Sequence, residues 1–336
     1  MVINMKIDKA DILSMLRGND GYVSGQQLCE RFEVSRTAVW KVINQLKEEG
    51  YQIESVTNKG YKLVETPDVL SKSEITSRLS TKWAGCEVYY LDETGSTNID
   101  AKRYAEEGAS HGAVVVADMQ NSGRGRRGRM WQSPPGSAIY MTIILKPDFL
   151  PDKAAMLTLV MALSVAGAIT EATDLRAGIK WPNDIVVNKK KVCGILTEMN
   201  VEQDYIQYVV TGVGINVNIA KPEEFPEEIR QTATSLRIEK GELINRAALI
   251  ERVLCHFEKN YDTFVRTLDL SGLMETYDEY LLNLNSEVKV LDPKGEYTGI
   301  ARGINEAGEL IVEKDDGTVE QVYAGEVSVR GIYGYV

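Results

Sequence analysis

The chain has 336 residues, of which 43% are hydrophobic and 26% charged, a composition typical of globular proteins and a length that predicts two or three domains. Its 38 basic and 49 acidic residues give a formal net charge of -11. This balance argues against a general attraction to nucleic acid or to an anionic membrane. Local clusters of basic residues are therefore informative.

Cysteine usage and apolar runs predict a cytoplasmic protein without a membrane segment. The longest weakly polar run, 154–170, is shorter than the ~20 residues that span a bilayer, and we expect a buried helix there. His111 and His256 have no carboxylate or thiol nearby in the sequence and are expected to be structural. No CxxC pair suggests a zinc site or a disulfide framework among the four cysteines, which are Cys29, Cys86, Cys193 and Cys255.

The first 66 residues have the pattern of a DNA-binding module. Ser24, with Gln27 three positions later, forms a capping box that opens a short helix, and a second helix begins at Ser35. Between Ser35 and Lys47 there are three basic residues and no acidic one, although residues 1–66 carry nine of each sign. The apolar face of this second helix has i, i+3, i+4 and i+7 spacing and consists of Val39, Val42, Ile43 and Leu46.

A hairpin predicted over 51–64 completes a winged helix-turn-helix. The second helix would enter the major groove, and Lys59 on the wing would reach the phosphate backbone. Trp40 lies close to the exposed face, where domain packing and DNA contact are both open interpretations. A protein–protein or vestigial role for the module is the alternative. The candidate DNA contacts on the helix are Arg36, Thr37, Lys41 and Asn44.

Four arginines and three glycines make up the segment 123–129. Guanidinium groups stay charged and match phosphate or carboxylate, while glycines let the backbone approach an anion closely. A dinucleotide-binding GxGxxG motif needs a following helix, which Pro134 and Pro135 block. The His-Arg-Asp and Asp-Phe-Gly sequences of a kinase are absent, and a disordered RGG segment would repeat. The segment is therefore predicted to be an anion-binding loop between strands at 113–117 and 138–145.

Other polar clusters lie in the central region, whose alternating helices and strands predict an α+β fold with a mixed or antiparallel sheet. The Ser-Thr-Asn segment 96–98 precedes a helix, where capping is the simpler interpretation. Segment 180–184 ends in Asp184, which has the chemistry to hold a metal bound to phosphate. Lys191 follows a lysine-rich hairpin tip and would be able to lean inward. Segment 212–218 contains glycines and asparagines for a base or ribose, or simply a bulge.

Together these clusters resemble the bifunctional biotin protein ligases that also repress the biotin operon. The resemblance rests on 96–98, Gln120 with 123–129, 180–184, Lys191 with Gly194-Ile195-Leu196, and 212–218. It implies a winged helix-turn-helix over 1–66, a mixed-sheet catalytic domain of the class II synthetase-like biotin/lipoate ligase type over 67–284, and a small SH3-like β-barrel over 285–336. Alternating strands and turn sequences in the tail independently suggest an all-β module.

The resemblance also implies a reaction in two steps. The biotin carboxylate attacks the α-phosphate of ATP to give biotinyl-5'-adenylate, and a carrier lysine then attacks this anhydride. No tightly bound cofactor is expected, because biotin and ATP with Mg²⁺ are substrates. The implied biotin-binding residues are Ser96, Thr97, Asn98, Gln120, Arg124, Gly125, Arg126 and Lys191. Arg124, Arg126 and Lys191 would be catalytic, Asn183, Asn216 and Arg330 would contact the nucleotide, and Asp184 would hold magnesium.

The implied partners are a biotin carboxyl carrier protein of acetyl-CoA carboxylase or a related carboxylase, operator DNA, and a second copy of the chain. Adenylate binding would order loops and favour a homodimer. Segment 219–233 should cover the adenylate, but it offers only Phe225 as an aromatic platform, so the residue that stacks on adenine stays open. The alternatives are a biotin-responsive transcription factor that has lost catalysis and a lipoate-type ligase.

Overall fold

The computed structural model describes residues 7–291, 295–323 and 328–331. Its internal contacts divide the chain into two units. The first unit comprises residues up to Ser80 together with Asn245–Glu251, and the second comprises the remainder. The first unit thus extends past residue 66, and the domain boundaries inferred from the sequence stay predictions.

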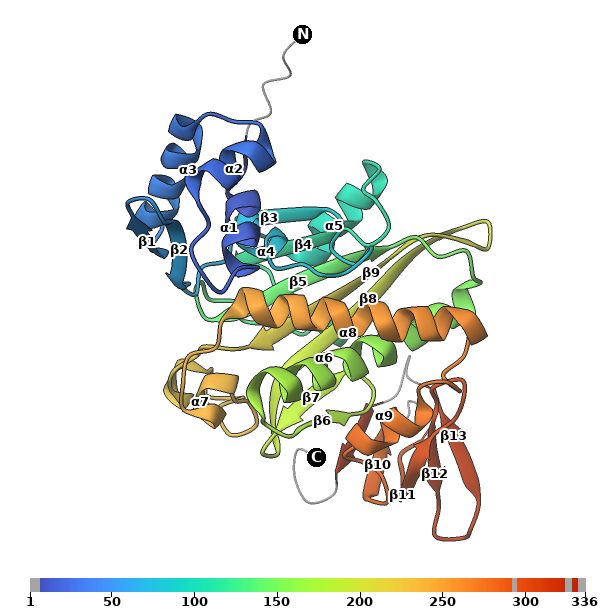
Figure 1. Ribbon diagram of the computed structural model, residues 1–336. Helices are drawn as coiled ribbons and strands as arrows, with labels where there is room; N and C mark the ends of the chain where they lie inside the picture. Colours follow the sequence, from blue (N-terminus) through green and yellow to red (C-terminus); the bar gives the residue numbers. More distant parts are fainter. Residues whose placement is uncertain (1–6, 292–294, 324–327, 332–336) are drawn as a thin grey trace. The chain divides into compact units, whose positions relative to one another are not determined.

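The first unit contains short helices and a two-stranded antiparallel hairpin (Figure 1). The predicted capping box is confirmed, because the Ser24 hydroxyl accepts from the Gln27 amide and the Gln27 side chain accepts from the Ser24 amide. Ser35 caps the next helix by accepting from the Ala38 amide at 3.2 Å. The elements are α1 (Lys9–Arg17), α2 (Gly25–Phe32), α3 (Arg36–Glu48), β1 (Gln52–Val56), β2 (Gly60–Glu65) and α4 (Lys72–Thr76).

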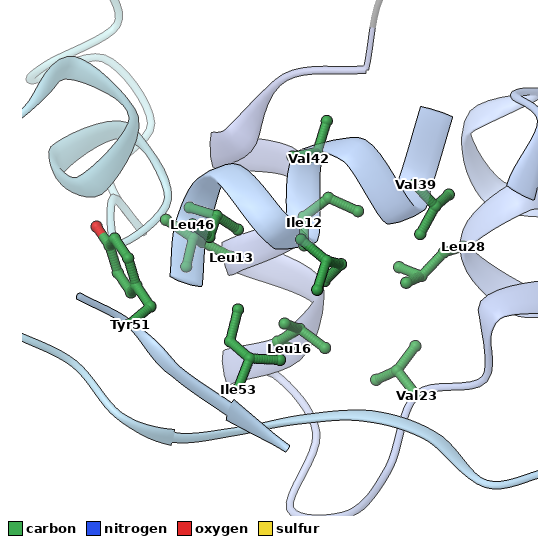
Figure 2. Packing of buried hydrophobic residues seen from close by; sticks show 11 residues of the cluster. Ile12, Leu13, Leu16, Val23, Leu28, Val39, Val42, Leu46, Tyr51 and Ile53 are labelled. Carbon is green, nitrogen blue, oxygen red and sulfur yellow. The ribbon is translucent and has the colours of Figure 1, made fainter. Parts of the chain in front are cut away.

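One apolar core holds α1, α2, α3 and the hairpin of this unit together (Figure 2). Leu13 of α1, Leu28 of α2 and Ile53 of β1 pack there with all four residues predicted for the apolar face of α3. Burial of each apolar side chain of this size stabilises the folded state by roughly 1.5–3 kcal/mol. The opposite face of α3 therefore takes no part in this core.

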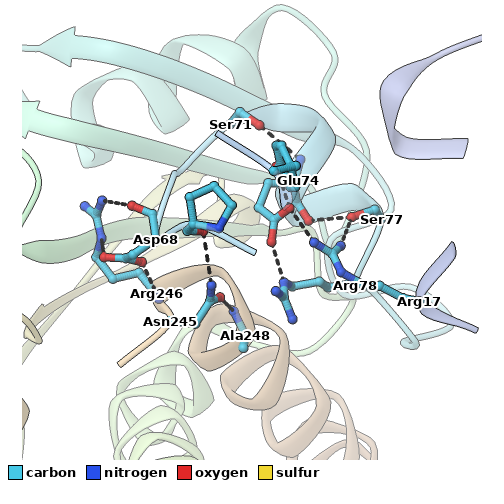
Figure 3. Close-up of polar contacts among 11 residues, drawn as sticks. Arg17, Asp68, Ser71, Glu74, Ser77, Arg78, Asn245, Arg246 and Ala248 are labelled. Atoms are coloured by element: carbon cyan, nitrogen blue, oxygen red, sulfur yellow. Dashed lines mark hydrogen bonds and ion pairs between the residues drawn. The ribbon is translucent and has the colours of Figure 1, made fainter. Parts of the chain in front are cut away.

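A buried carboxylate joins α4 to Arg17 of α1 (Figure 3) and to Tyr51, the residue directly before β1. Glu74 is fully buried, and it accepts hydrogen bonds from Arg17 at 2.5 Å, from the Tyr51 hydroxyl at 2.6 Å and from Arg78 at 2.6 Å. A buried charge is costly unless it is paired and hydrogen-bonded, and this one is both. The contacts make α4 part of the first unit.

Polar contacts also attach the segment Asn245–Glu251 to the residues that follow the hairpin (Figure 3). The Asp68 carboxylate accepts from the backbone amide of Arg246 at 2.8 Å and from its Nε at 2.9 Å. Arg246 is only 3% exposed, so this ion pair is largely removed from water. No local sequence pattern pointed to this pair, whose partners are 178 residues apart.

The second unit is built on a seven-stranded sheet in the order β3-β4-β5-β9-β8-β7-β6 (Figure 1). Only β3 and β4 pair in parallel, which confirms the predicted mixed sheet. The predicted buried helix is confirmed as α6 (Leu157–Thr173). The strands are β3 (Val88–Thr94), β4 (Val114–Gln120), β5 (Ala138–Leu145), β6 (Ala177–Lys180), β7 (Asp184–Val187), β8 (Lys190–Glu202) and β9 (Tyr205–Asn216). The other helices are α5 (Thr97–Glu106), α7 (Leu236–Lys240), α8 (Arg246–Thr267), whose residues up to Glu251 belong to the first unit, and α9 (Met274–Tyr280).

The described part of the tail forms a five-stranded antiparallel sheet in the order β13-β12-β11-β10-β14. Val288, Ala301 and Val312 are fully buried in it. The expectation of an all-β module is confirmed. Its strands are β10 (Glu287–Leu291), β11 (Tyr297–Ile304), β12 (Leu310–Glu313), β13 (Val319–Val322) and β14 (Ser328–Gly331).

Candidate functional site

A pocket of about 360 Å³ lies on one face of the seven-stranded sheet. Its floor is made by β8 and β9, where Gly194 pairs with Gly214 and Leu196 with Gly212. Alternate residues of a strand point to the same side, so these four positions share one face. Three of them are glycines, which leaves space above the sheet for other groups.

The arginine-glycine loop between β4 and β5 forms one wall of this pocket. It closes on itself, because the Trp131 amide donates to the Gly123 carbonyl at 2.9 Å and the Gly125 amide to the Arg129 carbonyl at 2.8 Å. A Cβ on Gly123 would collide with the carbonyl oxygen of Trp131, so the loop needs glycine there. The predicted strand-loop-strand arrangement is confirmed.

Arg126 is the most enclosed arginine of the loop and reaches a neighbouring hairpin. Its Nη1 donates to the side-chain oxygen of Asn183 at 3.1 Å. Burial lowers the pKa of Arg126, the adjacent charge of Arg127 adds to that effect, and Asp184 opposes it. A guanidinium stays charged nonetheless, so an anion bound beside it would relieve both unfavourable effects. Arg124 also lines the pocket and is exposed at its rim.

Lys191 leans into the pocket from the start of β8. Its Nζ lies 2.6 Å from a carboxylate oxygen of Asp184 and 5.3 Å from the ring centroid of Trp131. The backbone of Lys191 also bonds to segment 219–233, because its amide donates to the Thr232 carbonyl at 2.8 Å. Lys191 therefore contacts the sheet through Asp184, the arginine-glycine loop through Trp131, and segment 219–233 through Thr232.

The Ser-Thr-Asn segment turns its side chains to the pocket and does not cap the helix. Ser96 occupies the N-cap position of α5 but makes no side-chain capping bond, so the capping interpretation is wrong. The amide of Thr97 donates to the Gln120 side-chain oxygen at 2.9 Å, and the Gln120 amide group donates to the Ser133 hydroxyl at 2.9 Å. These polar groups form a fixed array along one wall.

Asn98 is held in one orientation by its neighbours. Its Nδ2 donates to Glu198 at 2.8 Å and to the Leu196 carbonyl at 3.2 Å, while its Oδ1 accepts from the Thr142 hydroxyl at 2.7 Å. Lys102 pairs with the same Glu198 at 2.6 Å. Burial acts to raise the pKa of Glu198, but the bonds from Lys102 and Asn98 outweigh it and hold that pKa below its usual range.

The sequence pointed to neither Glu198 nor Trp131. Trp131 lies over the floor, where a Cβ on Gly214 would come within 2.8 Å of its ring. Its indole N–H is buried and finds no hydrogen-bond partner among the described residues. Both residues act through contacts distant in sequence, so no local spacing could have identified them. The polar clusters themselves were the only available signal.

Only some of the residues predicted to bind the nucleotide or the metal line the pocket. Asn183, Asp184 and Asn216 line the pocket, and the Asn216 side chain donates to the Thr234 carbonyl at 3.1 Å. Arg330 lies on β14 opposite Lys289, and the structure describes its backbone only. Within the described ranges, no group of three or more His, Cys, Asp or Glu side chains is placed to hold a metal.

The candidate DNA contacts belong to the first unit. Arg36, Thr37 and Lys41 are exposed on α3, Asn44 is partly exposed, and Lys59 is exposed at the tip of the β1–β2 hairpin. The Arg36 guanidinium donates to the Gln26 side chain of α2 at 3.0 Å. The structure therefore places these five side chains on the helix and wing predicted for them.

Comparisons with known proteins agree with this architecture. Family models match residues 9–62 (HTH domain), 90–216 (Biotin/lipoate A/B protein ligase family) and 284–330 (Biotin protein ligase C terminal domain). The biotin protein ligase from Aquifex aeolicus, solved with biotin and ATP, matches with a TM-score of 0.63 and 32% identity. That alignment covers 73% of this chain and 99% of the other.

Several relatives match over nearly the whole chain, and two of them illustrate this. The bifunctional ligase/repressor BirA of Bacillus subtilis (strain 168) is 40% identical over 312 residues, which cover 93% of this chain and 95% of that protein. The bifunctional ligase/repressor BirA of Escherichia coli (strain K12) is 30% identical over 318 residues, with coverage of 95% and 96%. The chain therefore belongs to the family of bifunctional biotin ligase/repressors.

Proposed function

We propose that the chain joins biotin to AMP in the pocket beside the arginine-glycine loop and then transfers biotin to a lysine of biotin carboxyl carrier protein. One observation carries this proposal. Motifs that are far apart in the sequence line a single pocket and supply both cations and neutral polar groups: Ser96, Thr97, Asn98, Gln120, Arg124, Gly125, Arg126 and Lys191.

The chemistry requires two anions to meet, and the pocket offers the cations for it. The carboxylate of biotin and the α-phosphate of ATP repel each other until positive groups neutralise and align them. Arg124, Arg126 and Lys191 supply that charge. The hydroxyl and amide groups of segment 96–98 and Gln120 match the N–H and C=O groups of the ureido ring. The carrier lysine then displaces AMP, so no enzyme nucleophile is needed.

The nucleotide would lie on the side of Asn183 and Asn216, and Arg330 of β14 is its third candidate contact. We assign to Asp184 the magnesium ion that accompanies ATP, because Mg²⁺ commonly takes one or two carboxylates together with substrate phosphates. When bound, the ion neutralises phosphate charge. The aromatic residues that line the pocket are Trp131 and Phe225, and one of these two rings would stack on the adenine.

Removing the carboxylate that holds Asn98 should weaken biotin binding alone. We expect Glu198→Ala to raise the KM for biotin roughly 10-fold, because Asn98 loses a charge-assisted acceptor and becomes free to rotate. The KM for ATP should stay unchanged. Glu198→Gln, which keeps an acceptor oxygen, should recover most of the affinity. Equal shifts in both KM values, or in neither, would show that Glu198 does not position the biotin site.

Arg126→Gly should loosen the hold on the adenylate. Losing one charge-assisted contact, worth about 1.5–3 kcal/mol, should speed dissociation of biotinyl-5'-AMP about 10- to 150-fold. Stopped-flow displacement of the bound adenylate measures this rate. Arg129→Gly, at an exposed position of the same loop, is the matched control and should have a smaller effect. An unchanged rate in Arg126→Gly would contradict the assignment.

A carrier-labelling assay tests the proposed activity. Purified biotin carboxyl carrier protein should gain biotin only when the chain, biotin and ATP with Mg²⁺ are all present. Lipoate in place of biotin should give no product. Labelling with lipoate alone would favour the lipoate-type alternative, and no labelling with either acid would favour a sensor that has lost catalysis.

We also propose that the first unit binds operator DNA and that biotinyl-5'-AMP promotes a homodimer that places two copies of α3 on a two-fold site. The exposed cationic side chains of α3 and the wing support this proposal. The affinity for the operator and the sedimentation coefficient of the protein should both rise when biotin and ATP are added. Equal affinity with and without adenylate would mean that DNA binding is not under ligand control.

A further inference from the structure

The exposed face of α3 carries a large apolar side chain that the core does not use. Trp40 is 59% exposed, whereas its neighbour Val39 is 1% exposed and packs in the core. In Figure 2 the labelled α3 side chains Val39, Val42 and Leu46 all belong to the opposite, buried face. The packing of the first unit therefore does not explain a tryptophan at this position.

Helix geometry places Trp40 among the candidate DNA contacts. At 3.6 residues per turn, Arg36, Trp40 and Asn44 follow one another along one stripe, with Thr37 and Lys41 beside it. Across the described residues, the Trp40 side chain makes no hydrogen bond or ring contact within the chain. Single exposed apolar residues are common on proteins, so it is the position within this face that carries information.

The surroundings of Trp40 match a polyanion. The stretch from Ser35 to Lys47 has three basic residues and no acidic one, in a chain of net charge -11. The bond from Arg36 to Gln26 fixes one of these cations in the first turn of the helix. A cationic stripe selects the phosphate backbone without regard to sequence, whereas an apolar group in the major groove reads the thymine methyl.

We propose that Trp40 is a specificity-determining contact to operator DNA, with its indole packed against thymine C5-methyl groups or deoxyribose carbons between the positions of Arg36 and Lys41. This inference rests on the proposed DNA-binding function. Trp40 supplies sequence discrimination through apolar contact, while Arg36, Lys41 and Lys59 supply most of the charge-dependent affinity. Substitution of Trp40 should thus separate specificity from general DNA binding.

The test compares the full chain and its variants on two duplexes in the presence of biotin and ATP. One duplex is selected from a randomised library by the wild-type chain, and the other is an unselected duplex of equal length. Trp40→Ala should bind the selected duplex about 10-fold more weakly and the unselected duplex with unchanged affinity. The slope of affinity against salt should not change, because no charge is removed.

Leu150→Ala is the matched control, since Leu150 is 62% exposed and lies in the second unit. It should bind both duplexes as the wild type does, and both variants should label the carrier at the wild-type rate. Replacing thymine by uracil in the selected duplex distinguishes the two apolar contacts. A methyl contact predicts that uracil weakens the wild type but not Trp40→Ala, and a sugar contact predicts no effect of uracil on either.

Two outcomes would overturn the inference. If Trp40→Ala binds the selected duplex as tightly as the wild type, or loses affinity equally on both duplexes, Trp40 does not determine specificity. If the wild type enriches no duplex at all, the proposed DNA-binding function fails and this inference fails with it.

Discussion

Lys191→Met should lower kcat/KM for biotin-dependent adenylate formation by about 10²–10³-fold, the loss typical when one charge-stabilising donor is removed from an active site. The Lys191 ammonium lies 2.6 Å from Asp184 and 5.3 Å from the Trp131 ring, in the pocket where the two anions would meet. Methionine keeps much of the side-chain volume beside that ring and removes only the charge. Pyrophosphate release under single-turnover conditions measures the effect.

Two controls keep this result interpretable. Lys189→Met changes an exposed lysine at the tip of the same hairpin and should leave kcat/KM unchanged. Lys191→Arg, which keeps the positive charge at this position, should retain more activity than Lys191→Met if it is the charge that acts on the substrates. A Lys191→Met enzyme within twofold of wild type would remove this lysine from the mechanism.

Glu74→Ala should destabilise the first unit by about 3–5 kcal/mol, because it leaves Arg17 and Arg78 without their buried carboxylate. Glu74 is 0% exposed and bonds to both arginines and to the Tyr51 hydroxyl. Hydrogen exchange of the α1 and β1 amides in the full chain reports the free energy of opening of this unit. Carrier labelling should persist, since the pocket lies in the second unit.

The control for that variant is Glu74→Gln, which keeps one acceptor oxygen, replaces the other with an NH2 donor and removes the charge. Its destabilisation should be smaller than that of Glu74→Ala. If α1 and β1 exchange at wild-type rates in Glu74→Ala, the carboxylate does not hold α4 to the rest of the unit.

Much of the fold could be predicted from local patterns in the sequence. The capping box at Ser24, the start of α3 after Ser35 and the apolar face of α3 follow from contacts within one or two helical turns. The two prolines after the arginine-glycine loop excluded a following helix, and β5 begins at Ala138 as expected. Such features depend on residues close in sequence, so spacing alone reveals them.

What the sequence did not reveal depends on contacts between distant segments. β6 was not predicted, because it has only four residues and pairs with β7 only after the chain reverses at 181–183. The Glu74 cluster joins three segments that are distant in the sequence, and Glu198 meets Asn98 across 100 residues. Burial and partners decide the meaning of such carboxylates, and neither is written in the local pattern.

The most direct test of the whole account is to mix the wild-type chain with biotin and ATP, without carrier protein, and to measure pyrophosphate and bound biotinyl-5'-AMP together. We predict a burst of pyrophosphate stoichiometric with the chain, which requires both substrates, and an equal amount of adenylate retained by the protein. No pyrophosphate at any protein concentration, or the same release without biotin, would contradict the assignment of this pocket to biotin activation.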